Sequence, residues 1–107
     1  MNNSRFTDAH AISQRRATRG LIKFCEDHGY DVGGVEELRV CLKALDKKDM
    51  KSAVEAHLRV PLGSMGCFDD WLPPVMFANE TTDYARAVFE ALVTQWNLVM
   101  RLSVPKH

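Results

Sequence analysis

The fold is decided by one stretch, TDYARAVFEALVTQWNLVMRL, which runs from Thr82 to Leu102. Its apolar residues recur every three or four positions, which is the spacing of one face of an α-helix. A helix that is apolar around much of its circumference is contacted from more than one side, so we expect this one to be central. The main face holds Ala85, Val88, Phe89, Leu92, Trp96, Val99 and Met100, and Tyr84, Ala91 and Val93 widen it.

Three further helices are predicted before it. Gly29 marks the end of the first, because glycine tolerates the left-handed conformation that follows many helices. Asp49 is suited to cap the third. The second and third are joined by a short link, which is typical of an antiparallel helical hairpin. The first begins between Thr7 and Ser13 and ends before Gly29, the second runs from about Val35 to Leu45, and the third from Met50 to about Arg59.

The whole chain fits a single domain. Its 107 residues are near the commonest domain size, and no segment shows the alternation typical of a β-strand. We therefore predict an all-α, single-domain, four-helix bundle-like fold over residues 1–107, with residues 1–8 and 103–107 frayed. The formal net charge of zero gives no overall attraction to nucleic acid or to an anionic membrane. It also offers little charge repulsion against a homodimer.

A long apolar connector, PLGSMGCFDDWLPPVMFANE, joins the third and fourth helices from Pro61 to Glu80. Connectors are usually short and polar, so this one is expected either to cover the core, which we favour, or to bind a partner. Phe68 to Leu72 could form one helical turn, stopped by the two prolines that follow. Methionine and aromatic residues are typical of binding surfaces. The candidate partner-binding residues are Met65, Phe68, Trp71 and Met76, with Asp69 and Asp70 as a polar rim.

A thiol enzyme using Cys67 and His57 is one alternative function. A catalytic thiol needs a base within hydrogen-bond reach, and no local signature accompanies these two residues, so we expect Cys67 to be structural. Asp69 and Asp70 beside either residue would mix hard and soft ligands, a mixture that fits no common metal. We expect no catalytic residues, no metal and no cofactor.

A nucleic-acid binder is a second alternative. Arg15, Arg16, Arg19 and Lys23 give the first helix a basic face that could contact phosphates. No aromatic residue for base stacking lies among them, so we interpret this face as solvated and do not expect nucleic acid as a partner.

Three cysteines, Cys25, Cys41 and Cys67, form no CxxC pair and are odd in number. This favours reduced thiols and a cytoplasmic location. The N-terminus has no apolar leader, and no apolar run is long enough to span a bilayer. We expect neither secretion by a signal peptide nor a membrane partner.

The segment GSMGCFDDWLPPVMF, followed by YARAVFEALVTQW, resembles a group of small uncharacterised bacterial helical proteins with a Gly-x-Met-Gly-Ser-Phe-x-Asp type turn. Here the turn is Gly63, Met65, Gly66, Phe68 and Asp70, with Cys67 where serine is usual. The resemblance covers the C-terminal half and implies a soluble bacterial helical protein without naming an activity. Such proteins are similar in size to immunity or antitoxin-like partners. Our leading hypothesis is a non-enzymatic module that binds another protein.

Overall fold

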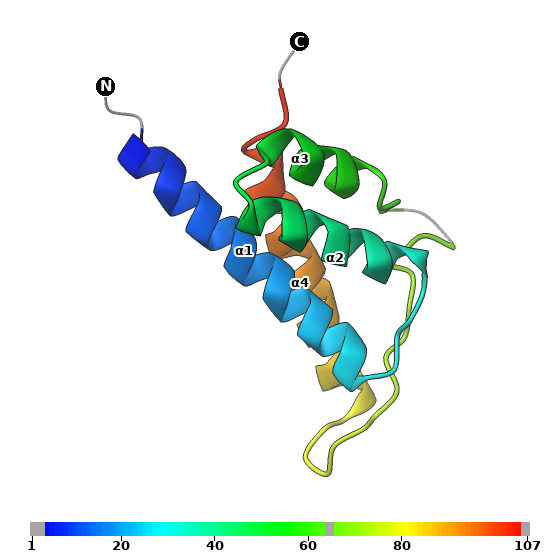
Figure 1. Cartoon of the computed structure of the whole chain (residues 1–107). Helices are drawn as coiled ribbons and strands as arrows, with labels where there is room; N and C mark the ends of the chain where they lie inside the picture. Colours follow the sequence, from blue (N-terminus) through cyan, green and yellow to red (C-terminus); the bar gives the residue numbers. More distant parts are fainter. Residues whose placement is uncertain (1–3, 64–65, 106–107) are drawn as a thin grey trace.

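Four α-helices form the part of the chain that the computed structural model describes, residues 4–63 and 66–105, the side chains of residues 4–9 excepted (Figure 1). Those ranges contain no strand, and the all-α prediction is confirmed. The helices are α1 (Ser4–Asp27), α2 (Gly33–Asp46), α3 (Met50–Leu58) and α4 (Thr82–Arg101).

Helix α1 packs against both α2 and α4, while α3 packs on α2 and touches α4. Helices α1 and α4 are antiparallel, since Gln14 in the middle of α1 bonds Val99 near the end of α4, while Phe24 further along α1 stacks on Phe89 further back in α4. In Figure 1, α4 lies behind α1 and α2. The expectation that α4 is enclosed on several sides is only partly correct. Val93 is buried, but Tyr84 and Ala91 are exposed, because no helix covers that side of α4.

The helix ends follow local chemistry. Asp49 caps α3 as predicted, with its carboxylate accepting a hydrogen bond from the backbone N–H of Ser52 at 3.1 Å. Thr81 caps α4 by accepting from the backbone N–H of Tyr84 at 3.1 Å. Gly29 ends α1 at a φ of 77°, the left-handed conformation expected there.

Both ends of the predicted fold are more ordered than the sequence suggested. Helix α1 begins at Ser4, ahead of the predicted start, so residues 4–8 are helical rather than frayed, while residues 1–3 lie outside the described ranges. At the other end, Ser103 donates its backbone N–H to Met100 O and accepts a bond from Gln14. Residues 106–107 lie outside the described ranges.

The core is mostly apolar but contains polar side chains that the sequence analysis missed. Gln14 is fully buried and donates its Nε2 to Val99 O at 3.0 Å and to Ser103 Oγ at 2.8 Å. Thr18 donates its hydroxyl to Gln14 O at 2.6 Å. The two bonds of Gln14 tie α1 to the C-terminal end of α4, whereas the bond of Thr18 lies within α1. The largest fully buried apolar side chains belong to Trp96, Phe89, Leu21, Leu38, Leu45 and Met100.

The predicted helical turn from Phe68 to Leu72 is wrong. The chain makes one hydrogen-bonded turn there, with Asp70 N–H donating to Cys67 O at 2.9 Å, and has no helical or strand structure from Asp70 to Met76. Leu72 precedes a proline, and a residue in that position disfavours the helical conformation. Pro73 itself is buried against the core.

Candidate partner-binding surface

The first half of the connector is part of the core. Phe68 is only 4% exposed, and its ring lies 5.3 Å from the ring of Tyr30 and 5.8 Å from that of Phe89. The Tyr30 hydroxyl donates to Phe68 O at 2.7 Å. Phe68 is therefore not a surface residue, which corrects its assignment to the partner-binding set. Aromatic side chains of the chain itself surround Phe68, where the sequence predicted contact with a partner protein.

Trp71 extends this aromatic group. Its indole stacks on the Tyr30 ring at 3.9 Å with an interplanar angle of 9°, and meets the Phe89 ring edge-on at 5.0 Å. It is half-buried. The connector thus covers the core at Phe68 and Trp71, in agreement with the favoured expectation for this half.

Asp69 and Asp70 shape the turn that carries Phe68. The Asp69 carboxylate accepts from Gly63 N–H at 3.0 Å, and the Asp70 carboxylate accepts from Gly66 N–H at 2.8 Å. Both glycines have positive φ, 90° and 81°, which few other residues adopt without strain. The two aspartates therefore stabilise the turn itself. Their predicted role as the polar rim of a binding surface comes second to this structural role.

The second half of the connector is exposed. Leu72, Val75, Met76 and Phe77 keep between 47% and 56% of their surface in contact with solvent. We call these four residues the connector patch. Of the predicted set, Met76 belongs to it, and Met65 lies outside the described residues. Leu72, Val75 and Phe77 were missed, although they stand in the same apolar run as Met76, around Pro73 and Pro74, which was a usable signal.

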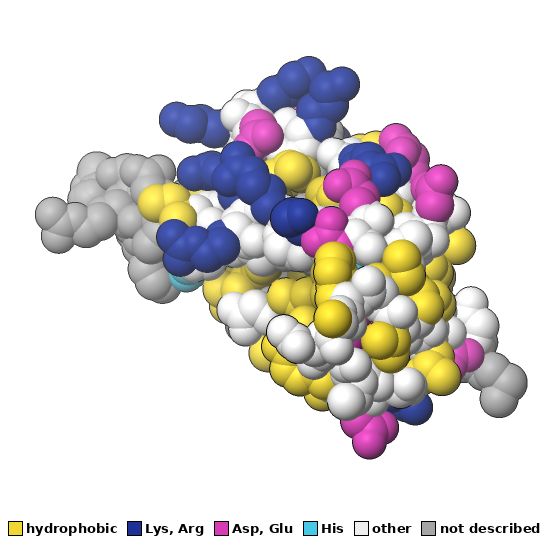
Figure 2. Space-filling view, turned by 90° about the horizontal axis from the view of Figure 1, so that it is seen from below, with side chains coloured by type: hydrophobic (Ala, Val, Ile, Leu, Met, Phe, Trp, Pro, Cys, Tyr) yellow, Lys and Arg dark blue, Asp and Glu magenta, His cyan; other side chains and the backbone are white. Residues whose placement is uncertain are grey.

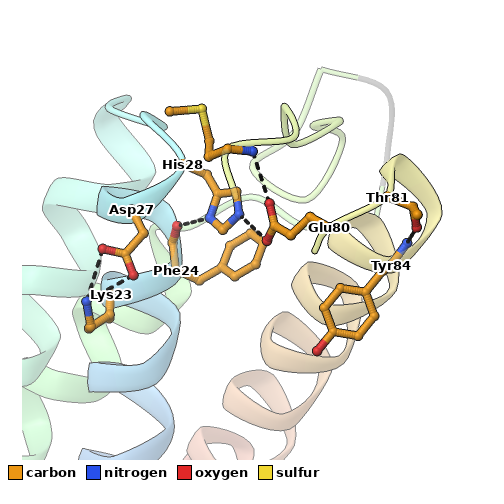
Figure 3. Close-up of polar contacts among 8 residues, drawn as sticks. Lys23, Phe24, Asp27, His28, Glu80, Thr81 and Tyr84 are labelled. Carbon is orange, nitrogen blue, oxygen red and sulfur yellow. Dashed lines mark hydrogen bonds and ion pairs between the residues drawn. The ribbon is translucent and has the colours of Figure 1, made fainter. Parts of the chain in front are cut away.

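A buried ion pair fixes the end of the connector patch (Figure 3). His28 Nδ1 donates to Phe24 O at 2.9 Å, and its Nε2 lies 2.8 Å from Glu80 Oε2. The Phe24 carbonyl oxygen only accepts, so Nδ1 is the donor of the first bond, and the second contact joins Nε2 to a carboxylate oxygen of Glu80. Both side chains are largely buried. No local pattern of residues indicates a pair whose members lie so far apart along the chain.

Glu80 also binds the patch directly. Its Oε1 accepts from the backbone N–H of Met76 at 3.0 Å. The pKa of the Glu80 carboxyl is lowered below its ordinary value. The bond from the Met76 backbone is the largest cause, and the hydrogen bond and charge of His28 add to it. The His28 ring stacks on Phe24 at 3.9 Å and meets the Phe77 ring edge-on at 5.5 Å. Backbone and side chain of the patch are therefore both held against the end of α1.

His57 and Cys67 have different surroundings. His57 Nε2 is 2.8 Å from Asn97 Oδ1, and its Nδ1 is buried without a hydrogen-bond partner among the described residues. Burial lowers the pKa of the His57 ring. Cys67 lines a shallow pocket with Tyr30 and Phe68, on the connector side of α2. Neither ring nitrogen of His57 bonds the thiol, so the structure does not bring this pair together as nucleophile and base.

Metal ligands do not converge either. Among residues 10–63 and 66–105, no three His, Cys, Asp or Glu side chains lie close enough to share an ion.

The basic face of α1 is partly neutralised. Arg19 pairs with Asp46 at 3.4 Å, and Lys23 with Asp27 at 2.9 Å. Arg15 is half-buried, which leaves Arg16 as the exposed member without an ion pair to a described residue. In Figure 2 the Lys and Arg side chains gather over one part of the face and the hydrophobic side chains over another.

Comparison of the chain with protein-family models, with curated proteins and with solved structures finds no match. No helix within the described ranges combines the length and the apolar character needed to cross a bilayer.

Proposed function

We propose that this chain is a non-enzymatic protein-binding module that uses the connector patch as its docking surface. The observation that carries the proposal is the exposure of four large apolar side chains, Leu72, Val75, Met76 and Phe77, within one short segment. Apolar side chains exposed side by side, rather than singly, are typical of sites that bind a protein. Methionine and aromatic residues at such sites carry much of the binding energy.

The patch is held in a fixed shape before any partner arrives. Phe68 and Pro73 are buried at one end of it, and Glu80 bonds both His28 and the backbone of Met76 at the other. Binding to a segment that is already ordered avoids much of the entropy cost of ordering it. This supports a docking surface over a loose loop.

The charges beside the patch favour a partner with basic groups at its edge. Asp69, Asp70 and Glu90 line a hollow with Leu72 of the patch, and the cation that lines it, Arg86, already pairs with Glu90. Opposite charges at an interface rim speed association and set its orientation. The proposed partner is therefore another protein with an apolar contact area bordered by lysine or arginine. A cytoplasmic location belongs to the same proposal, since Cys25 and Cys41 are buried thiols outside any disulfide.

A double substitution tests the proposal. Met76→Ser with Phe77→Ser removes apolar surface from side chains that are about half exposed, so the fold should remain intact. The matched control is Leu58→Ser, which changes another exposed apolar residue, on α3. The tagged wild-type protein is used to isolate a complex from the source cell, and the binding of the purified partner is then measured by calorimetry.

We expect the double variant to lose at least about tenfold in affinity, which corresponds to 1.4 kcal/mol, while Leu58→Ser binds as the wild type does. Circular dichroism and urea denaturation establish that both variants are folded. If the double variant keeps full affinity for the partner, the connector patch is not the docking surface.

The two alternatives have less support. A thiol enzyme would need a base beside Cys67, and His57 bonds Asn97 instead. On the basic face of α1, two of the four predicted side chains, Arg19 and Lys23, already pair with Asp46 and Asp27.

A further inference from the structure

Helix α4 has a second apolar face that its own fold leaves open. Tyr84, Leu98 and Leu102 are 55% to 60% exposed, and Ala87 and Ala91 are exposed as well. We call these five residues the outer face of α4. They recur at steps of three, four or seven along the helix, which is the spacing of a seam that packs on another helix. The inner face of the same helix, with Phe89, Trp96 and Met100, is already buried.

We infer that the outer face of α4 binds the same face of a second copy of the chain, in an antiparallel pair centred on Ala91. Tyr84 lies seven residues before Ala91 and Leu98 seven residues after it. A two-fold axis at Ala91 therefore places Tyr84 of each copy against Leu98 of the other. A homodimer of this kind presents the same surface twice, so the surface must complement itself.

The sizes of the side chains fit this arrangement. At the centre, Ala91 meets Ala91, and Ala87 meets the exposed Gln95. Small residues at the centre allow two helix axes to approach to about 8 Å, the lower end of the usual range. Large residues at both ends then close the contact, with one Tyr84–Leu98 pair on each side.

The charges fit it as well. Asp83 and Arg101 are eighteen residues apart, about five helical turns, so both lie on the same flank of α4. Neither forms an ion pair with another residue of the described ranges. In the antiparallel pair, Arg101 of one copy comes next to Asp83 of the other, twice by symmetry. A parallel pair would instead place this flank of one copy on the opposite side of the seam from the same flank of the other, so neither residue would gain a partner of opposite charge.

The length of the seam sets the expected strength. From Tyr84 to Leu102 it extends about 27 Å along the helix. A single helix face of this length lies at the small end of stable interfaces. We expect dissociation in the micromolar range, and the formal net charge of zero gives no overall repulsion to oppose it.

The test is sedimentation equilibrium of the full chain, from about 1 μM to about 500 μM, a span chosen to bracket a micromolar dimer. The wild type should change from monomer to dimer within this span. Ala91→Glu should remain monomeric, because it places two carboxylates at the two-fold axis, and an exposed helical position accepts glutamate without loss of the fold. Leu58→Glu on α3 is the matched control and should dimerise as the wild type does.

A charge exchange tests the antiparallel direction. Asp83→Arg should weaken the dimer, and Asp83→Arg combined with Arg101→Asp should restore it. A chain that stays monomeric over the whole span overturns the inference. A dimer that persists in Ala91→Glu also overturns the inference. Loss of the dimer in the Met76→Ser, Phe77→Ser variant overturns it too, because that result assigns self-association to the connector patch. Failure of restoration by the double charge variant overturns the antiparallel register.

Discussion

Replacing Gly34 by alanine tests the contact that seats the connector on the core. Gly34 lies in the first turn of α2, and a Cβ built on it would lie 2.4 Å from Phe68 Cδ1. Two more atoms of the same ring would lie at 3.1 and 3.2 Å. The ring cannot simply move aside, because Tyr30 and Phe89 hold it from other directions. We expect Gly34→Ala to force the connector away from α2.

The neighbouring glycine provides the matched control. Gly33 is also in the first turn of α2, and a Cβ added there meets no atom within 4 Å. Gly33→Ala should stabilise the protein by about 0.4–1 kcal/mol, since alanine restricts the unfolded chain. The same gain applies to Gly34→Ala, but overpacking against a buried ring costs about 1–3 kcal/mol, so the net effect should be destabilising.

Urea denaturation followed by circular dichroism measures both free energies of unfolding. A third measurement isolates the contact: in a Phe68→Leu background, which removes the ring, Gly34→Ala should lose much of its penalty. If Gly34→Ala stabilises the protein as much as Gly33→Ala does, then Phe68 does not lie against α2 and the described seating of the connector is wrong.

Three further predictions concern buried polar groups and thiols. Gln14→Ala should lower the free energy of unfolding by about 1–3 kcal/mol in urea denaturation, because it leaves a buried carbonyl of α4 without a donor, and a change within error would contradict the tie between α1 and α4. The folded pKa of Glu80 is lowered, so its stabilisation is present above the ordinary glutamate pKa and is lost as pH falls through the folded value. Urea denaturation between about pH 5 and pH 3 should show a steeper loss of stability for the wild type than for Glu80→Gln, and equal slopes would refute this. Native thiol labelling should modify Cys67 before Cys25 and Cys41, whose burial raises their pKa values to about 12 and about 11, and rapid modification of either buried thiol would contradict the described core.

The helices were predictable because their signals are local. The apolar repeat in α4, the aspartate before α3 and the glycine after α1 each act within a few residues, and each appears in the structure at its expected place. The early start of α1 was not predictable from apolar spacing, because its first residues carry no apolar stripe. The exposed side of α4 was missed for a different reason, since periodicity shows which residues are apolar but not whether anything covers them.

The connector was predictable only in part. Its apolar character correctly indicated that some of it covers the core, as Phe68 and Trp71 do. The division between a buried first half and an exposed second half depends on contacts with residues far away along the chain, such as Tyr30 and His28. Such contacts leave no local pattern, so Phe68 was assigned to the surface and the pair of His28 with Glu80 was not foreseen.

The pairing of α1 with α4 has a consequence for the order in which the chain acquires its structure. Gln14 and Val99 are partners from opposite ends of the sequence, so their meeting closes a loop that includes most of the protein. Contacts of this kind form late, whereas the neighbouring α2 and α3 can pair early. During synthesis on the ribosome, α1 cannot pack fully against α4 until the final residues of α4 have been added. Until then, the apolar side chains of Leu21 and Phe24 are not fully covered by the rest of the core.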